Sequence, residues 1–94
     1  MNGCDHELLV CLTEVCAEVQ KPACKALRFG LDCAWTGGRS NRREITAEIG
    51  GLLAVVDRLV AARVLDDADI QQARRDKAKV LPKFLMQQRP AGGQ

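Results

Sequence analysis

The chain has 94 residues, a formal net charge of +2 and 47% hydrophobic residues, with only 3% aromatic residues. This length predicts one domain with a small core, so pairing of two copies would bury more apolar surface. No apolar run approaches the roughly 20 residues that span a bilayer, and the acidic start does not fit a signal peptide. We therefore expect a soluble, cytoplasmic protein with no membrane partner.

The five cysteines form no CxxC pair and are accompanied by a single histidine, His6. An odd number of cysteines with this spacing fits neither a zinc site nor a disulfide framework. We interpret them as small apolar residues of a reducing compartment. A catalytic thiol is not expected, because His6 lies near the end of the chain and is poorly placed to activate one.

The first predicted helix covers residues 5–29. Pro22 sits inside it, where proline removes a backbone hydrogen bond and clashes with the preceding turn, so we expect a kink or a break at residues 19–21. Gly30 is expected to end the helix. The apolar stripe of this helix recurs at helical spacing and consists of Leu8, Leu12, Val15, Cys16, Val19, Ala23, Ala26 and Leu27.

Residues 31–39 are expected to form a loop, with Gly37 and Gly38 as its turn. Trp35 covers the edge of the core or offers a stacking platform for a base, and the first use is the commoner one. Cations near a helix N-terminus oppose its dipole, so the arginines before the next helix mark a bound anion or a solvated cluster. These residues are Arg39, Arg42 and Arg43.

The longest amphipathic run predicts a second helix over residues 41–62, with Ser40 as its N-cap. Gly50 and Gly51 interrupt it, and two interior glycines cost about 1 kcal/mol each relative to alanine. We therefore expect a requirement other than helix propensity at these two positions. The apolar side chains fall on one face and are Ile45, Ile49, Leu52, Leu53, Val56, Leu59 and Val60.

Asp66 is expected to cap a third, mostly polar helix over residues 67–80, with Ile70 and Ala73 facing inward. The sequence after this helix predicts less regular structure. Pro82 stops the helix or starts a short fourth turn through Phe84, Leu85 and Met86, and residues 89–94 are typical of a flexible tail.

The predicted fold class is all-α, a bundle of three to four helices in one domain of residues 1–88. We expect this bundle to form a dimer. The sequence shows no internal repeat, and it contains no Walker A loop, dinucleotide fingerprint or catalytic triad pattern. None of the common nucleotide-binding or hydrolytic motifs therefore identifies a site.

Charge is divided unevenly along the chain. Residues 1–70 carry eight Lys/Arg and eleven Asp/Glu, a net charge of −3, whereas residues 71–94 carry six and one, a net charge of +5. The basic segment can bind an anion or nucleic-acid phosphates, although a solvated helix face is the commoner explanation. Its basic residues are Arg74, Arg75, Lys77, Lys79, Lys83 and Arg89.

Two pairs of glutamates, each spaced four residues apart, are the candidate metal ligands. Glu14 and Glu18 lie on the first predicted helix, and Glu44 and Glu48 lie on the second. If the two helices pack antiparallel, the pairs can approach, and clustered carboxylates suit Mg²⁺ bridged to phosphates. A solvated acidic face is the alternative.

Three segments resemble the MazG-like all-α nucleoside triphosphate pyrophosphohydrolases in order and spacing: EVCAEV…KALRFG, NRREITAEIGGLLAVVDRLV and LPKFL. The resemblance covers residues 8–85 and implies a MazG-like helical bundle that assembles as dimers or larger oligomers. It implies hydrolysis of (d)NTPs to monophosphate and pyrophosphate with Mg²⁺, which an ExxE motif on one helix and an ExxD motif on the next would hold. Lys25 and Arg28 match a stretch that can lie near the substrate phosphates.

The sequence departs from this family pattern at two of four motif ligands. Val15 replaces the first glutamate of ExxE and Gly51 replaces the aspartate of ExxD, whereas Glu18 and Glu48 are kept. We therefore expect weak Mg²⁺ binding. The leading hypothesis is a non-catalytic binding or inhibitor protein, for example a phage or mobile-element protein that blocks a host defence complex. The alternative is an active or impaired Mg²⁺-dependent nucleoside triphosphate pyrophosphohydrolase.

A binding protein of this kind offers two charged surfaces to a partner. A nucleic acid would contact the basic C-terminal segment through phosphates, with a strong dependence on salt. A host protein with a basic groove would contact the four glutamates instead. The residues expected to contact nucleic acid are Arg74, Arg75, Lys77, Lys79 and Lys83.

Overall fold

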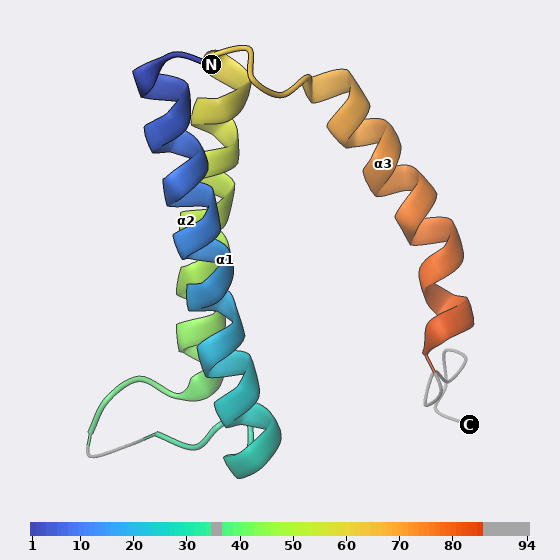
Figure 1. Ribbon diagram of the computed structural model, residues 1–94. Coiled ribbons are helices and arrows are strands. Elements are labelled where there is room, and N and C mark those ends of the chain that lie inside the picture. The colour runs from blue at the N-terminus through green and yellow to red at the C-terminus, as the bar shows by residue number, and fades with distance from the viewer. Residues whose placement is uncertain (35–36, 86–94) are drawn as a thin grey trace.

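The computed structural model describes residues 1–34 and 37–85, and within these ranges the chain is helical and has no strand. The α-helices α1, α2 and α3 span Gly3–Phe29, Asn41–Ala61 and Asp67–Val80, and the short 3₁₀ helix η1 spans Leu81–Phe84. Figure 1 shows α1 and α2 as an antiparallel hairpin, while residues 67–85, which we call the arm, stand apart from it. The all-α prediction is confirmed.

Helix α1 begins where Asn2 caps it, because the Asn2 side chain accepts a hydrogen bond of 2.7 Å from the Asp5 N–H. The helix continues through Pro22, so of the two predicted outcomes the break is wrong, whereas the kink stays a prediction. Pro22 is the buried residue of α1, and packing in the hairpin offsets the hydrogen bond that its ring removes. As predicted, Gly30 ends the helix, with a φ of +104° that favours glycine.

Helix α2 begins at the predicted cap, where Ser40 accepts a hydrogen bond of 3.2 Å from the Arg43 N–H. Leu59 is the fully buried hydrophobic residue of the described chain, at 0% exposure. The expected single apolar face is divided, since Leu53 remains 57% exposed. On α1, Leu27 is 88% exposed and also lies outside the core to which its stripe assigned it. A two-helix hairpin covers only one narrow strip of each helix, which leaves the flanks of the predicted stripes uncovered.

The two glycines of α2 have free space around them. A Cβ atom built on Gly50 or on Gly51 would meet nothing within 4 Å. Close helix packing within the single chain therefore does not require glycine at either position, and the structure supplies no steric reason for the pair.

A hydrogen-bonded turn joins α2 to the arm. Arg63 has a φ of +62°, and the N–H of Val64 donates to the Leu59 carbonyl over 3.0 Å. Asp66 then caps α3 as predicted, accepting a 3.0 Å hydrogen bond from the Asp69 N–H. Ala73 was expected to face inward but is exposed, because α3 does not pack along the hairpin.

Some predictions fall on residues outside the described ranges. These are the role of Trp35, the inclusion of Met86 in the turn after Pro82, the position of Arg89 and the tail of residues 89–94. In the described part of the predicted turn, the short helix η1 includes Pro82 and ends at Phe84. None of the helices in the described residues has the length and apolar character needed to cross a membrane.

Candidate functional site

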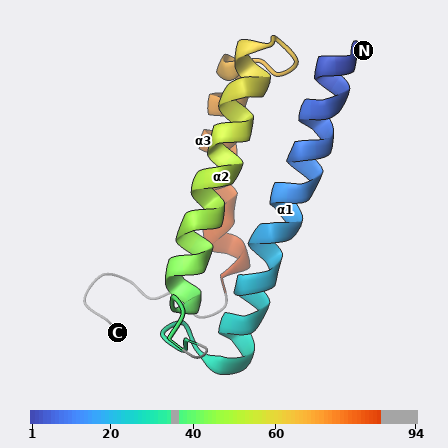
Figure 2. The ribbon, with the colours of Figure 1, turned by 90° about the vertical axis from the view of Figure 1, so that its left-hand side faces the viewer.

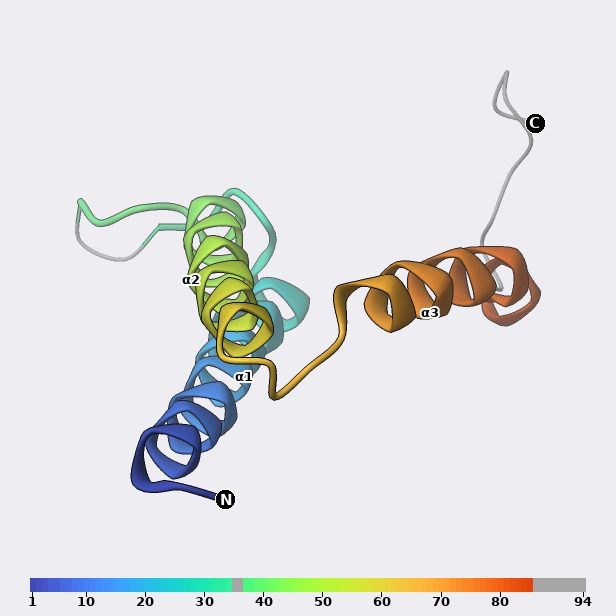
Figure 3. The same cartoon turned by 90° about the horizontal axis from the view of Figure 1, so that it is seen from above.

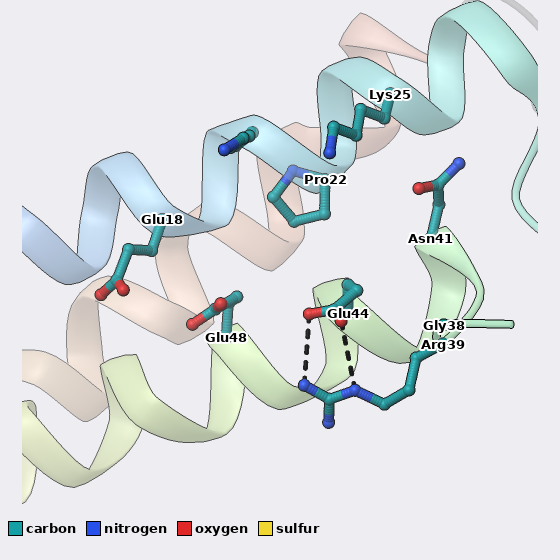
Figure 4. Close-up of a pocket in the computed structure, with 9 residues that line it drawn as sticks. Glu18, Pro22, Lys25, Gly38, Arg39, Asn41, Glu44 and Glu48 are labelled. Atoms are coloured by element: carbon teal, nitrogen blue, oxygen red, sulfur yellow. Dashed lines mark hydrogen bonds and ion pairs between the residues drawn. The ribbon is translucent and has the colours of Figure 1, made fainter. Parts of the chain in front are cut away.

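An open cavity of about 420 Å³ lies between α1, α2 and the loop that joins them (Figure 4). It contains both acidic and basic side chains, which come from three consecutive parts of the chain. The hairpin therefore brings together residues that are more than 20 positions apart in sequence. The lining residues are Glu18, Lys21, Pro22, Lys25, Gly38, Arg39, Asn41, Glu44 and Glu48.

The antiparallel register of the hairpin fixes which residues face each other across this cavity. Glu18 on α1 lies opposite Glu48 on α2, and Pro22 lies opposite Glu44 (Figure 4). Moving one way along α1 means moving the other way along α2, at the same rise of about 1.5 Å per residue. The residue numbers of two facing residues therefore add up to the same value, about 66, all along the hairpin.

The same register shows what lies beside this pair of glutamates. It places Val15 opposite Gly51, one helical turn beyond the pair formed by Glu18 and Glu48. Neither valine nor glycine has a side-chain oxygen, so this level of the hairpin offers no metal ligand. The site thus has one level of facing carboxylates and none at the next level.

The three carboxylates of the cavity differ in their partners. Glu44 is held by Arg39, whose Nε and Nη2 lie 3.2 and 3.3 Å from its carboxylate oxygens. Glu18 and Glu48 have no ion-pair partner in the described residues. Glu14, the fourth predicted ligand, is exposed on α1 and does not line the cavity.

These carboxylates do not fit a catalytic Mg²⁺ centre of the kind that the family pattern implies. No group of three His, Cys, Asp or Glu side chains that could hold a metal ion occurs in residues 1–34 and 37–85. Glu18 and Glu48 remain as two oxygen donors, while Glu44 is already paired with a guanidinium. Mg²⁺ requires near-octahedral oxygen coordination, so two carboxylates support only a weakly held, mostly hydrated ion.

The basic side of the cavity combines two residues that the sequence singled out with one that it did not. Lys25 was expected near phosphates, and Arg39 was expected in a cluster that binds an anion or is solvated; both line the cavity together with Lys21. Lys21 is one turn from both Glu18 and Lys25, so helical spacing could have revealed it. Both lysines lack an ion-pair partner among the described residues.

Arg28, the second residue predicted to lie near phosphates, is placed elsewhere. Its guanidinium carbon lies 5.1 Å from the centroid of the Phe29 ring, and it does not line the cavity. A cation over an aromatic face is a stabilising arrangement at the end of α1. The hairpin therefore brings Lys25 but not Arg28 to the site.

The loop that closes the cavity is fixed by Asn41, which is buried. Its Nδ2 donates a 2.9 Å hydrogen bond to the Gly30 carbonyl, and its backbone N–H donates over 3.0 Å to the Cys33 carbonyl. Only the folded loop creates these contacts, so helix periodicity could not have identified Asn41. These hydrogen bonds tie the end of α1 to the start of α2.

An exposed ion pair holds the same loop from outside. Arg42 Nε lies 2.9 Å from Asp32 Oδ1. The hydrogen bond and charge of Arg42 hold the pKa of Asp32 below its ordinary value, and Asp32 in turn raises the pKa of Arg42. Because Arg42 is engaged here, it is not directed into the cavity.

The basic residues of the arm lie far along the chain from the cavity and form local contacts. Arg74 donates to Gln71 over 3.0 Å, and Arg75 donates to Gln72 over 2.8 Å. Arg75, Lys79 and Lys83 are exposed. Lys77 lies 5.9 Å from the centroid of the Phe84 ring. The predicted nucleic-acid contacts are thus on the arm and separate from the carboxylates of the hairpin (Figure 1).

The chain matches no protein-family model, no curated protein and no solved structure. The chemistry of the cavity therefore has to be argued from its own residues. That chemistry is a charge-balanced site with two unpaired lysines, two facing glutamates and no level with more than two carboxylates.

Proposed function

We propose that this protein is a non-catalytic, MazG-like binding or inhibitor protein that holds the phosphate groups of a nucleotide in the hairpin cavity. The observation that carries the proposal is the contrast between the two sides of the cavity. Its basic side keeps Lys21 and Lys25 without partners, while the carboxylate side has lost the level of Val15 and Gly51. Phosphate binding is favoured by this arrangement and metal-dependent hydrolysis is not.

The lysines supply the attraction for phosphate. An ammonium group is a compact cation with three donors, and lysine is a common phosphate ligand in proteins. The two lysines are four residues apart on one helix, so they can contact neighbouring phosphate groups of the same nucleotide. Glu18 and Glu48 lie one turn away and would repel phosphate placed beside them, which directs the anion toward the lysines.

Hydrolysis would need a metal that is held firmly enough to activate water. With two carboxylates remaining, we expect an Mg²⁺ dissociation constant no tighter than about 1 mM and no appreciable turnover of dNTPs. The alternative function is an active or impaired nucleoside triphosphate pyrophosphohydrolase. It is favoured by one observation, that Glu18 and Glu48 still face each other across the cavity.

One experiment separates these two functions. A panel of dNTPs is titrated into the protein with and without Mg²⁺, and pyrophosphate release is measured in the same samples. Binding without release is expected, and Lys25→Gln should weaken it at least tenfold. Arg58→Gln removes the same charge from an exposed position of α2 outside the cavity and should leave nucleotide binding unchanged.

Two results would contradict the proposal. Turnover on the order of 1 per second or faster would show a working enzyme. Equal nucleotide affinity in the unaltered protein and in Lys25→Gln would show that the cavity is not the phosphate site.

We also propose that the protein acts as a homodimer. The support is the small core, in which Leu59 is the fully buried hydrophobic residue of the described chain. A chain of this length that buries so little apolar surface is marginal as a monomer. Light scattering at tens of micromolar is expected to give twice the chain mass of 10.3 kDa, and a single-chain mass would contradict the dimer.

A further inference from the structure

Helix α2 carries a second apolar stripe that its partner in the hairpin does not cover. Val56 and Val60 are half-buried, whereas Leu53 and Ile49 are exposed. These residues recur at intervals of four, three and four positions, so they lie along one face of the helix. That face is about 85° around the helix from the face that contains Leu59, at 100° per residue. It is therefore a distinct surface rather than the edge of the hairpin core.

The uncovered stripe lines a groove that begins at the turn between α2 and the arm. The groove measures about 340 Å³. Only its end near the turn is closed by α3, because the arm then leaves the hairpin, as the view from above shows (Figure 3). The residues that line the groove are Leu53, Val56, Asp57, Val60, Asp67, Ile70, Gln71 and Arg74.

The far end of the arm is apolar and exposed as well. Phe84 is 69% exposed, and its neighbours leave much of their surface in solvent too. Single exposed apolar residues are common, but a cluster at the end of a projecting helix marks an interaction surface. The exposed residues of this cluster are Val80, Leu81, Phe84 and Leu85.

The projecting direction of the arm is set by the structure of the turn. The Val64 and Leu65 N–H groups both donate to the Leu59 carbonyl, over 3.0 and 3.3 Å. Arg63 adopts the left-handed conformation that such a helix end requires. These bonds tie the base of the arm to the buried end of α2. The course of the arm is thus set by a hydrogen-bonded turn and not by a loose linker. Figure 2 shows α3 leading away behind α2 from this turn.

Charge complementarity indicates what fills the space between hairpin and arm. Residues 3–20 of α1 carry four acidic side chains and no Lys or Arg, a net charge of −4. Residues 70–85 of the arm carry five basic side chains and Asp76, a net charge of +4. The acidic half of α1 and the arm do not contact each other within one chain. A second copy can satisfy both, since each copy offers an apolar stripe, an acidic helix and a basic arm.

We propose that a second copy of this chain occupies the groove, so that its α2 stripe packs on the stripe of the first copy and each arm reaches over the acidic half of the other's α1. This inference rests on the dimer of the proposed function and adds which surfaces form it. The interface is isologous, and it covers the exposed aliphatic residues of α2 together with the apolar end of the arm.

A matched pair of variants tests the stripe. Leu53→Glu places a charge on the stripe, whereas Leu27→Glu makes the same change at a position of α1 that is 88% exposed and lies outside residues 3–20. We expect a halved mass by light scattering for Leu53→Glu and an unchanged dimer for Leu27→Glu. A dimer in both variants would overturn the proposed interface but keep the dimer. A single-chain mass for the unaltered protein would overturn both.

A second measurement holds even if Leu53→Glu fails to fold. Unaltered ¹⁵N-labelled and unlabelled protein are mixed and treated with a carbodiimide, which joins lysines directly to carboxylates. We expect mixed-label peptides that link Lys77, Lys79 or Lys83 to the carboxylates of residues 3–20, and we expect 1 M salt to reduce them several-fold. If the arm forms no mixed-label links to α1, or forms them only to other segments, the proposed docking of the arm is wrong.

Discussion

Restoring the two missing carboxylates by Val15→Glu with Gly51→Asp should recover metal binding. The hairpin register places the new side chains opposite each other, one turn from Glu18 and Glu48. A carboxylate about 4 Å from a unit positive charge contributes on the order of 4 kcal/mol at an effective dielectric constant of 20, before desolvation. If desolvation leaves a third of that value, about 1.4 kcal/mol remains, which corresponds to a factor of ten in the binding constant. We therefore expect Mg²⁺ affinity to rise at least tenfold.

The structure indicates that the double variant will fold. A Cβ at Gly51 meets no atom within 4 Å, so the aspartate side chain has room. The helix propensity of aspartate in a helix interior is more favourable than that of glycine by about 0.3 kcal/mol. Val15 is half-buried, so replacing it costs about 1 kcal/mol of hydrophobic burial. The net change from packing and helix propensity is roughly 1 kcal/mol or less, which is small against a typical unfolding free energy of about 5–15 kcal/mol. Repulsion among the four carboxylates adds to this cost until a cation binds.

The assay is calorimetric titration with Mg²⁺ and Mn²⁺, alongside pyrophosphate release from dNTPs. Val15→Gln with Gly51→Asn is the control, because it supplies similar shapes without the charge. Mg²⁺ should raise the melting temperature of the acidic variant and leave that of the control unchanged, since four clustered carboxylates repel until a cation binds. Equal metal affinity in the two variants would refute the assignment of these positions to one carboxylate cluster.

Three further predictions concern stability and titration. Leu59→Ala removes the fully buried leucine and should lower the unfolding free energy by about 2–4 kcal/mol in urea; a loss below about 1 kcal/mol would contradict its central role. Arg63→Gly should raise it by about 1 kcal/mol because it relieves a φ of +62°, whereas Arg63→Ala should not. By NMR, the pKa of Asp32 should lie below its ordinary value and rise in Arg42→Gln. Because this folded-state pKa is lowered, the pair stabilises the fold at neutral pH and loses that effect as the pH falls through the pKa of Asp32.

Local signals in the sequence were sufficient for the ends of the helices. Ser40 and Asp66 cap α2 and α3 through their own side chains, and Gly30 ends α1 with a positive φ. Each of these effects depends on neighbours a few residues away, so the sequence alone reveals it. The predicted break at Pro22 did not occur, because packing against α2 keeps the helix continuous across a residue that local rules treat as a breaker.

Tertiary placement could not be read in the same way. Hydrophobic periodicity shows which face of a helix is apolar but not which partner covers it. For this reason Ala73 was assigned to a core that α3 does not join, and Leu53 was assigned to the same face as Leu59. In the site, helical spacing brought Glu18 and Glu48 into consideration, whereas Lys25 was proposed only because its segment resembles the MazG-like proteins.

The contacts of Asn41 could not be read from the sequence. Its backbone N–H donates to the Cys33 carbonyl, and this contact depends on the path of the loop back to the hairpin. Arg39 differs, because its partner Glu44 lies on the first turn of α2, just past the Ser40 cap. Residues before an N-cap commonly meet the fourth helical position, so this local pair could have been predicted.

The positions of Val15 and Gly51 bear on how the proposed phosphate binding differs from metal-dependent hydrolysis. The hairpin register places these two residues opposite each other, so one level of the hairpin has no side-chain oxygen beside the pair of Glu18 and Glu48. The lysines lie on the other side of that pair, nearer the loop. Under the proposed function, phosphate and metal would therefore use different ends of the cavity, and the absence of carboxylates at one level would weaken metal binding without removing the cations that bind phosphate.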